Sequence, residues 1–288
     1  MKSPIVITHG DDLRRQVLAW RAAGESVGLV PTMGALHAGH LSLVARSVEE
    51  CRRTVVTIFV NPAQFGPNED FSRYPRRLEN DLELLAKANA DVVFAPTTDE
   101  MYRTSHATFV DVGEIAQRWE GAIRPGHFRG VATVVLKLFN LAPADRAYFG
   151  QKDYQQTVVI RRMVADLNLP IEIRVLPTVR EPDGLALSSR NAYLSADERN
   201  RALVLSRSLR LAAELVAGGQ RDAKLIAAEM RRVLESIPGL NLDYATLVDP
   251  DNLEEVSRVA GPVVAIVAAK LGSTRLIDNE IIDAPHGQ

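Results

Sequence analysis

Residues 27–60 read VGLVPTMGALHAGHLSLVARSVEECRRTVVTIFV, and the pattern of this stretch decides the fold class. An apolar run, Val27–Val30, is followed by a turn that contains two glycines. A helical pattern then covers His40–Arg53, and a second apolar run covers Thr54–Val60. Short apolar runs bounded by turns are typical of buried strands. The stretch therefore predicts a strand, a glycine turn, a helix and a second strand in succession.

The predicted helix His40–Arg53 is amphipathic, because its spacing places Leu41, Val44, Ala45 and Val48 on one face. The same alternation of strand and helix patterns continues to about residue 176. Further strands are predicted at Asp91–Ala95, Ala147–Phe149 and Ile171–Leu176, and further helices at Arg76–Asn89, Gly130–Leu141 and Tyr154–Leu167. This order predicts an α/β fold in which helices cover both faces of a parallel sheet. Ligands bind such folds outside the carboxyl ends of the strands, so we expect the chemistry in the loops that follow the strands.

A smaller α+β domain is predicted after about residue 184. A capping box of Ser195 and Glu198 opens its first helix. The predicted elements of this domain are helices at Ser195–Ala217 and Asp222–Ser236 and strands at Asp243–Val248 and Val263–Ala268. The turn-forming cluster Glu181–Gly184 marks the boundary, so we expect domains at residues 1–183 and 184–288.

Composition and the absence of long apolar runs bear on the partners and location of the protein. The 288 residues carry 34 basic and 36 acidic side chains and a net charge of −2, which gives no reason to expect binding to a nucleic acid. A single cysteine, Cys51, allows no internal disulfide. The N-terminal sequence lacks the apolar core of a signal peptide, and no apolar run is long enough for a membrane helix. We therefore expect a soluble, cytoplasmic protein without a membrane partner.

The segment between the first two predicted strands carries His37 and His40, three residues apart. On a helical turn the two side chains can face the same way. Two imidazoles beside a helix N-terminus suit a site that binds phosphate and stabilises negative charge growing on it. The alternative is a pair of surface histidines near a helix cap, but the strand before and the helix after favour the phosphate-binding interpretation. As zinc ligands they would form an incomplete set, because no third ligand is nearby.

Two further loops carry groups that can bind small molecules. Asn61 and Gln64 follow the second strand, and amide side chains there can bind hydroxyl and carboxylate groups. Alternatively, they cap the local turns. Arg124, His127 and Arg129 precede a predicted helix and can bind an anion, although three solvated cations on a turn explain them as well.

Two more segments carry groups that can hold a triphosphate. Lys152 follows a strand and a glycine and is placed to meet a phosphate, and Asp153 can hold Mg²⁺ or cap the next helix. The segment is not a P-loop of the Walker A type. Ser188, Ser189 and Arg190 lie just beyond the predicted domain boundary, where two hydroxyls and a guanidinium can clamp a reacting triphosphate. The alternative is a polar linker.

Five motifs together resemble the pantothenate synthetase family in their order and spacing over residues 24–195. They are PTMGALHAGH, FVNPAQFGPNEDF, RPGHFRGVATVV, YFGQKDYQQ and ALSSRN. The H-x-G-H element alone indicates only the wider group of nucleotidylyltransferases. The resemblance implies a Rossmann-like N-terminal domain, a C-terminal lid domain and a homodimer. It also implies the substrates pantoate, β-alanine and ATP, the last with Mg²⁺.

The resemblance also implies roles for individual residues. His37 would be a proton donor, Gln64 and Gln156 would bind pantoate, and Gln64 would also face β-alanine. Residues implied to bind ATP are Met33, Gly34, Ala35, Leu36, His37, Ala38, Gly39, His40, Gly150, Gln151, Lys152, Asp153, Val179, Leu187, Ser188, Ser189 and Arg190. Within this set Val179 would contact adenine through its backbone, and Asp153 would hold Mg²⁺ carried by ATP. The groups expected to act in catalysis are His37, His40, Lys152, Ser188, Ser189 and Arg190.

The expected reaction joins pantoate to β-alanine through a pantoyl-adenylate. The pantoate carboxylate attacks the α-phosphorus of ATP and releases pyrophosphate, and the amine of β-alanine then displaces AMP. The charge-bearing groups are expected to surround one triphosphate, and a lid hinged near Pro182–Gly184 would exclude water. Two alternatives remain, namely another H-x-G-H nucleotidylyltransferase and a non-catalytic nucleotide-binding module.

Overall fold

The computed structural model describes residues 3–67 and 69–283, which group into two compact units. Asn68, in the FVNPAQFGPNEDF motif, lies outside the described residues. Within them, unit 1 covers 3–117, 124–150 and 159–177, and unit 2 covers 118–123, 151–158 and 178–283. The division of the chain into domains at residues 183 and 184 stays a prediction.

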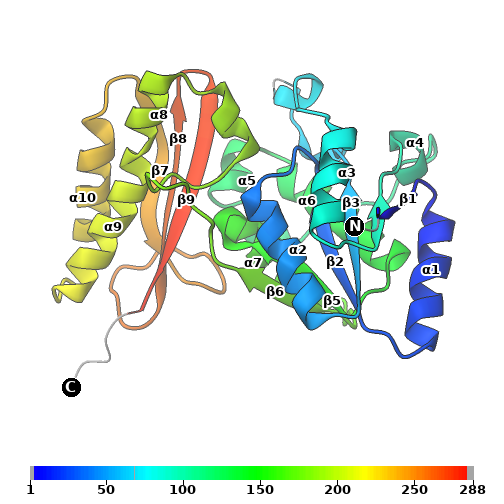
Figure 1. Cartoon of the computed structure of the whole chain (residues 1–288). Helices are drawn as coiled ribbons and strands as arrows, with labels where there is room; N and C mark the ends of the chain where they lie inside the picture. The colour runs from blue at the N-terminus through cyan, green and yellow to red at the C-terminus, as the bar shows by residue number, and fades with distance from the viewer. Residues whose placement is uncertain (1–2, 68, 284–288) are drawn as a thin grey trace. The chain divides into compact units, whose positions relative to one another are not determined.

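Unit 1 is built on a parallel sheet that, within the described residues, has six strands (Figure 1). The strands are β1 (Ile5–Ile7), β2 (Val27–Thr32), β3 (Arg53–Ile58), β4 (Val92–Phe94), β5 (Arg146–Gly150) and β6 (Glu172–Leu176). Every neighbouring pair in the order β1-β4-β3-β2-β5-β6 is parallel. The predicted α/β fold is confirmed, and strands β2 to β6 are the five that the apolar runs predict.

Helices connect these strands and pack on the sheet. Those that lie in unit 1 or are shared with unit 2 are α1 (Gly10–Ala22), α2 (Ala38–Glu50), α3 (Leu78–Lys87), α4 (Thr98–Met101), α6 (His127–Leu141) and α7 (Tyr154–Asp166). Short 3₁₀ turns are η1 (Pro62–Gln64), η2 (Asp70–Ser72) and η3 (Gly113–Ala116). Leu43 and Val44 of α2 and Leu85 of α3 pack on one sheet face with Val30 and Val56. Helix α6 packs against α1.

The predicted apolar face of α2 is partly wrong. Val44 is buried, but Ala45 and Val48 are exposed, and the buried side of the helix is completed by Leu43 and Ser47. Ser47 belongs there because its hydroxyl bonds the hydroxyl of Thr54 on β3 at 2.8 Å. A satisfied hydroxyl can occupy the helix–sheet interface at little cost, and a hydrophobicity pattern alone does not reveal it.

The strand order is Rossmann-like and determines where the loops with chemistry leave the sheet. Counted from β2, the run β4-β3-β2-β5-β6 has the order 3-2-1-4-5. The chain therefore reverses direction across the sheet between β2 and β5, which is the topological switch point of such folds. Because these neighbouring strands are parallel, their carboxyl ends at Thr32 and Gly150 lie at the same edge of the sheet.

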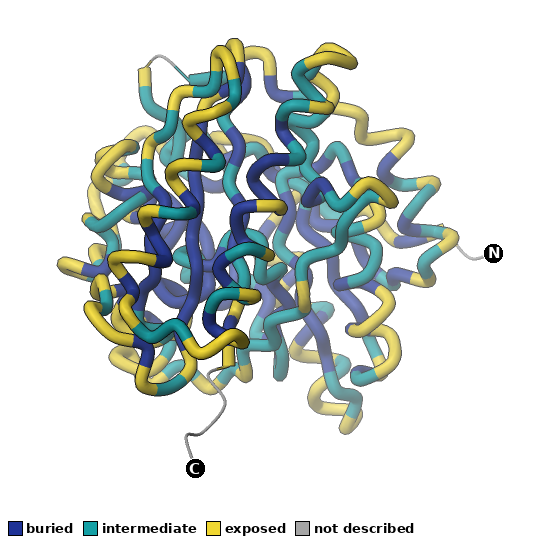
Figure 2. The backbone as a smooth tube through the Cα atoms, turned by 90° about the vertical axis from the view of Figure 1, so that its left-hand side faces the viewer, coloured by how far each residue is buried: buried dark blue, intermediate teal, exposed yellow. Residues whose placement is uncertain are grey.

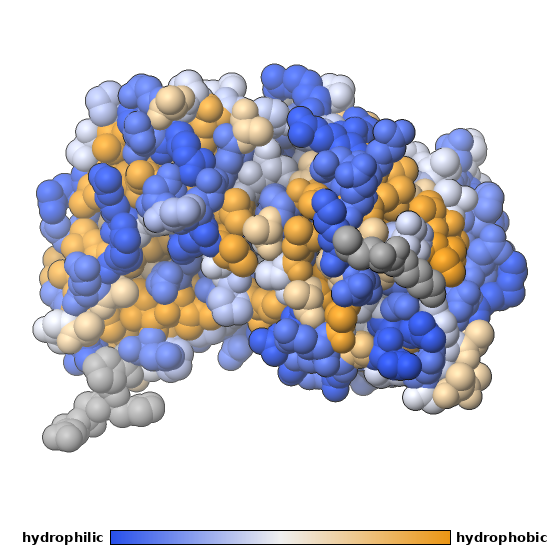
Figure 3. Space-filling view, in the orientation of Figure 1, coloured by the Kyte–Doolittle hydropathy of each residue, from blue (hydrophilic) through white to orange (hydrophobic). Residues whose placement is uncertain are grey.

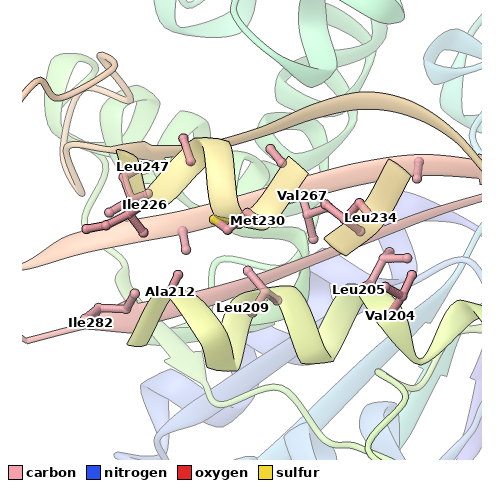
Figure 4. Packing of buried hydrophobic residues seen from close by; sticks show 14 of the residues in the cluster. Val204, Leu205, Leu209, Ala212, Ile226, Met230, Leu234, Leu247, Val267 and Ile282 are labelled. Atoms are coloured by element: carbon pink, nitrogen blue, oxygen red, sulfur yellow. The ribbon is translucent and has the colours of Figure 1, made fainter. Parts of the chain in front are cut away.

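Unit 2 is an α+β unit whose sheet, in the described part of the chain, has three antiparallel strands. Its strands are β7 (Leu240–Val248), β8 (Val263–Leu271) and β9 (Thr274–Ile282), and its helices are α8 (Ala196–Ala202), α9 (Val204–Ala217) and α10 (Ala223–Glu235). Figure 4 shows Leu209 of α9 and Met230 of α10 pointing into one core with Val267 of β8. Three short segments also belong to unit 2, namely α5 (Glu120–Ile123), η4 (Gln151–Asp153) and η5 (Ser189–Tyr193).

The predicted helix Ser195–Ala217 is two helices, so this prediction is wrong in one detail. The capping box of Ser195 and Glu198 is present as expected. The interruption falls at Leu203, whose ψ of −16° is closer to 3₁₀ than to α geometry. One residue of tighter winding therefore separates α8 from α9.

Burial follows the layers of each unit. The central strands β2, β3 and β4 are almost wholly buried, whereas the edge strands β1 and β6 are not. The helices alternate between buried and exposed residues (Figure 2). Figure 3 shows hydrophobic residues interspersed with hydrophilic ones over the face in view. No helix among the residues that the structure describes is both long and apolar enough to span a membrane.

Candidate active site

The loop between β2 and α2 is held at its start by the side-chain hydroxyl of Thr32. The hydroxyl of Thr32 donates to the carbonyl of Thr57 at 2.6 Å and accepts from the N–H of Gly34 at 3.2 Å. Gly34 and Ala35 have φ angles of 81° and 50°, in the left-handed region. Glycine adopts this region without strain, whereas alanine does so at a cost that the surrounding contacts must offset.

His37 and His40 lie together at the start of α2. His37 is the N-cap residue, and its Nδ1 accepts from the N–H of Gly39 at 3.2 Å. The Nδ1 of His40 accepts from the N–H of His37 at 3.4 Å, and the ring centroids are 4.1 Å apart. A ring that accepts at Nδ1 carries its hydrogen on Nε2 when neutral. Both imidazoles therefore carry an Nε2–H donor when neutral. The interpretation as residues near a helix cap is correct, and a role in binding phosphate stays a prediction.

A buried carboxylate holds this loop in place. Asp81, in the first turn of α3, is fully buried, and its oxygens accept from the N–H groups of Ala35 and Leu36 at 2.9 and 2.8 Å. Burial raises the pKa of Asp81, although the two N–H groups favour its ionised form. The sequence interpretation did not include this residue. A signal was present, because Asp81 lies at helical spacing from Leu78 and Leu85.

The loop after β3 ends in the turn η1, where Asn61 and Gln64 meet. Asn61 caps the turn by accepting from the N–H of Ala63 at 3.3 Å, so the alternative role as a turn cap is correct for this residue. Its amide nitrogen donates to Oε1 of Gln64 at 3.1 Å. The amide nitrogen of Gln64 lies 3.1 Å from the sulfur of Met33, in the loop after β2. The structure thus brings together two of the residues implied to bind substrates.

Arg124 and His127 support the backbone of this turn. The guanidinium of Arg124 donates from Nε to Glu69 at 2.8 Å and from Nη2 to the carbonyl of Gln64 at 3.3 Å. The Nδ1 of His127 lies 2.8 Å from the same carbonyl, and its Nε2 lies 3.2 Å from Arg124. A carbonyl can only accept and a guanidinium can only donate, so His127 is neutral here with its hydrogen on Nδ1.

The interpretation of this segment as three solvated cations is therefore wrong for Arg124 and His127, whereas Arg129 is exposed. The side chain of Arg124 is only 14% exposed and is paired with Glu69. Burial raises the pKa of Glu69, but its neighbours together, led by the hydrogen bond and the charge of Arg124, hold the pKa below the ordinary value. The guanidinium carbon of the third cation, Arg129, lies 4.2 Å from the centroid of the Phe109 ring, which is a cation–π contact.

In unit 2 the turn η4 follows β5 and carries Lys152. Asn279 of β9 is 2% exposed, and its amide nitrogen donates to the carbonyls of Gln151 and Lys152 at 2.9 and 2.8 Å. Its Oδ1 accepts from the side chain of Gln151 at 3.2 Å. The backbone that carries Lys152 is thus fixed by a strand 127 residues further along the chain. Gln156 follows in the first turn of α7 and is partly buried.

A magnesium ion carried by ATP fits one residue here. Asp153 has a side chain that is 49% exposed, and its Oδ1 lies 3.8 Å from the ammonium of Lys152. Within residues 3–67 and 69–283, no group of three or more His, Cys, Asp or Glu side chains is arranged to hold a metal. Mg²⁺ is commonly held by one or two carboxylates together with substrate phosphates. A single exposed carboxylate suits that arrangement.

The segment 178–190 forms a hairpin-like loop within unit 2. The carbonyl of Val179 accepts from the N–H of Leu187 at 3.0 Å. The N–H of Gly184 donates to the carbonyl of Glu181 at 2.8 Å and so closes a turn. Ser188 caps η5, since its hydroxyl accepts from the N–H of Arg190 at 3.2 Å. Ser189 lies in the same turn. The implied phosphate loop is therefore an ordered turn rather than a linker.

The sequence-predicted residues thus form two groups. Unit 1 holds the loop Met33–His40, Gln64 and Gly150, and unit 2 holds Gln151–Asp153, Gln156, Val179 and Leu187–Arg190. Their roles in binding and catalysis, and their meeting around one triphosphate, stay predictions.

Comparisons of the sequence and of the structure with known proteins all lead to the same family. The sequence profile of the family described as pantoate–β-alanine ligase matches residues 5–281. A pantothenate synthetase of Roseiflexus castenholzii is 58% identical over 259 residues, which cover 90% of this chain and 93% of that protein.

Two solved structures agree with the sequence matches. A pantothenate synthetase of Thermus thermophilus is 47% identical, with a TM-score of 0.90 over 96% of this chain and 98% of that one. A pantoate–β-alanine ligase of Francisella tularensis, complexed with β-γ ATP and β-alanine, is 33% identical, with a TM-score of 0.76 over 97% of this chain and 98% of that one. Since these matches span nearly the whole chain, the protein belongs to the pantoate–β-alanine ligase family.

Proposed function

We propose that the protein is an ATP-dependent ligase that condenses pantoate with β-alanine to give pantothenate, AMP and pyrophosphate. The observation that carries this proposal is the family match over residues 5–281. The geometry supports it, since the paired imidazoles of His37 and His40 and the ammonium of Lys152 provide donors for phosphate oxygens. The Francisella relative, complexed with β-γ ATP and β-alanine, supports ATP and β-alanine as substrates.

In the first step the pantoate carboxylate attacks the α-phosphorus of ATP, pyrophosphate leaves, and a pantoyl-adenylate forms. Negative charge increases on the phosphate oxygens, where the Nε2–H groups of His37 and His40 donate hydrogen bonds. Lys152 supplies a positive charge, and Ser188, Ser189 and Arg190 bind the remaining phosphate oxygens. His37 is the proton donor in this scheme.

Mg²⁺ bound with ATP would neutralise charge on the phosphates, and Asp153 is the residue that would hold it. The remaining residues orient the substrates. The backbone of Met33–His40 and Gly150–Asp153 lies along ATP, the backbone of Val179 and Leu187 contacts the nucleotide, and Gln64 and Gln156 bind pantoate.

In the second step the neutral amine of β-alanine attacks the acyl carbon, forms the amide bond and releases AMP. Gln64 also faces β-alanine. The amine loses its proton to solvent, since no side chain is assigned as its base. Water must be excluded until the amine arrives, because it would hydrolyse the adenylate. Lid movement of the C-terminal domain would provide that exclusion and stays a prediction.

Nucleotide products distinguish this function from the alternatives. With pantoate, ATP and Mg²⁺ the protein should exchange labelled pyrophosphate into ATP, and it should accumulate AMP and pantothenate only when β-alanine is added. A nucleotidylyltransferase that keeps the nucleotide on its product would release no AMP with β-alanine. A nucleotide-binding module would show neither exchange nor turnover, and either result would overturn the proposal.

A homodimer and a cytoplasmic location are part of the same proposal. The homodimer is supported by the resemblance to the family. Light scattering coupled to size-exclusion chromatography should give twice the mass of one chain. A mass of one chain across the concentrations used for assays would contradict the dimer.

A further inference from the structure

We propose that Tyr102 is a positioning residue, which acts through Asn61 to fix the amide of Gln64 so that its N–H groups face the substrate. The inference rests on the proposed function, in which Gln64 binds pantoate. It concerns a residue that follows α4 and lies outside all the motifs described above. The hydroxyl of Tyr102 donates to Oδ1 of Asn61 at 2.8 Å, across 41 residues of chain.

The orientation of the Asn61 amide follows from its partners. Its nitrogen lies 3.2 Å from the carbonyl of Gly130, which can only accept, and its oxygen lies 3.3 Å from the N–H of Ala63, which can only donate. The bond from Tyr102 is shorter than either and supplies the second donor to the oxygen. Asn61 is 1% exposed, so water does not compete for these bonds. Its amide therefore has one allowed orientation.

This orientation determines which atom of Gln64 faces Asn61. The Asn61 nitrogen is a donor, so the Gln64 atom 3.1 Å from it must be the amide oxygen. The amide nitrogen of Gln64 is then directed away, toward the sulfur of Met33 at 3.1 Å. A thioether is a weak acceptor, so a carboxylate or hydroxyl of pantoate would be a better partner for these N–H groups. A flipped Gln64 would instead present an oxygen that repels a carboxylate.

Tyr102 is held so that it remains a donor. Burial raises the pKa of Tyr102 to about 12, partly opposed by its bond to Asn61, so the phenol stays protonated at working pH. Its ring packs edge-on against the ring of His106, with the ring centroids 5.0 Å apart, and the centroid of the Phe59 ring lies 6.3 Å away. The ammonium nitrogen of Lys137 lies 5.7 Å from the centroid of the Tyr102 ring. These contacts do not involve the hydroxyl, so removal of the hydroxyl alone should leave the ring in place.

The test compares Tyr102→Phe with wild type in steady-state assays. Loss of the hydroxyl should raise KM for pantoate roughly three- to tenfold, the effect typical of one hydrogen bond, while KM for ATP stays within twofold. Tyr148→Phe is the matched control, because it removes the hydroxyl of another tyrosine, one that is bonded to Glu50 at 3.0 Å. The control should lose comparable stability in urea without a change in KM for pantoate. An equal change in KM for pantoate in the two variants would overturn the positioning role of Tyr102.

A double-mutant cycle separates the inference from the proposed function. Gln64→Ala should itself raise KM for pantoate, and adding Tyr102→Phe to it should have no further effect, because the group being positioned is gone. If Gln64→Ala binds pantoate as wild type does, the proposed role of Gln64 fails. If Gln64→Ala weakens pantoate binding and Tyr102→Phe has an additive effect or none, the role of Gln64 stands and the positioning by Tyr102 is refuted.

Discussion

The two histidines at the start of α2 each accept a backbone bond at Nδ1, which leaves the hydrogen on Nε2. We expect His40→Ala to lower the rate of adenylation by roughly 10²–10³, as the loss of one preorganised donor does elsewhere. Pyrophosphate exchange with pantoate measures that step alone. His40→Asn is the matched control, because its oxygen can replace Nδ1 in the cap while the Nε2–H donor is lost. It should be as slow as His40→Ala, and wild-type exchange in either variant would remove His40 from the site.

Acid should weaken the contacts that hold η1. The pKa of Glu69 is lowered in the folded state by Arg124, despite burial, so its ionised form stabilises the fold. That stability is present above the unfolded pKa of about 4.3 and is lost as pH falls through the lowered folded pKa. We expect Glu69→Gln to be less stable near neutral pH and to lose less stability on acidification below that pKa. Urea unfolding at several pH values measures this, and parallel profiles for the two proteins would contradict it.

At the scale of residues, the sequence predicted contacts between side chains that are close in the chain better than contacts between side chains that are far apart in it. The pairing of His37 and His40 follows from a spacing of three on a helical turn. Asp81 was missed although its position on an apolar helix face was visible, because a buried acid is recognisable only with its donors. The partners of Arg124 could not be predicted, since 55 residues separate it from Glu69.

Between elements, the contact of α6 with η1 depends on the absence of a side chain at Gly130. A Cβ there would lie 2.2 Å from the carbonyl oxygen of Ala63 and 2.7 Å from the nitrogen of Gln64. Both are backbone atoms, so the turn itself would have to move. We expect Gly130→Ala to cost about 1–3 kcal/mol of unfolding free energy and to raise KM for pantoate.

Thermal or urea unfolding and steady-state kinetics measure the two effects of Gly130→Ala. Leu136→Ala on the same helix is a suitable comparison, because Leu136 is only partly buried and has no part in the site. A Gly130→Ala variant with wild-type stability and pantoate KM would show that η1 adapts freely.

For helices and strands with a strong periodic pattern, most of the predicted bounds lie within a few residues of the observed ones. Strand β1 was missed because it has three residues, two of them exposed. Strand β9 was missed because polar residues interrupt it, among them Asp278 and Asn279, which are nevertheless buried. Asp278 pairs with Arg180 at 2.6 Å, so its burial depends on a partner that no local pattern reveals.

On the scale of the whole molecule, the turn η4 depends on strand β9. We expect Asn279→Ala to raise KM for ATP and to lower the adenylation rate, because the carbonyls of Gln151 and Lys152 lose their donors and Lys152 is no longer fixed. Asn279→Asp is the sharper variant, since its carboxylate would repel the two carbonyls.

Pyrophosphate exchange at varied ATP, compared with Gln64→Ala, measures the effect of the Asn279 variants. Gln64→Ala should raise KM for pantoate, whereas the Asn279 variants should raise KM for ATP. Variants at Asn279 that unfold at the wild-type urea concentration and bind ATP normally would refute the role of this contact.

The anchoring of η4 by Asn279 also has a consequence for biosynthesis. Synthesis must continue for 128 residues beyond Gln151 before Asn279 exists. At about 5–20 residues per second, the ribosome needs on the order of ten seconds for that distance. The turn η4 therefore cannot acquire its anchor while the parallel sheet is first emerging, and nascent chains stalled in this interval should not consume ATP.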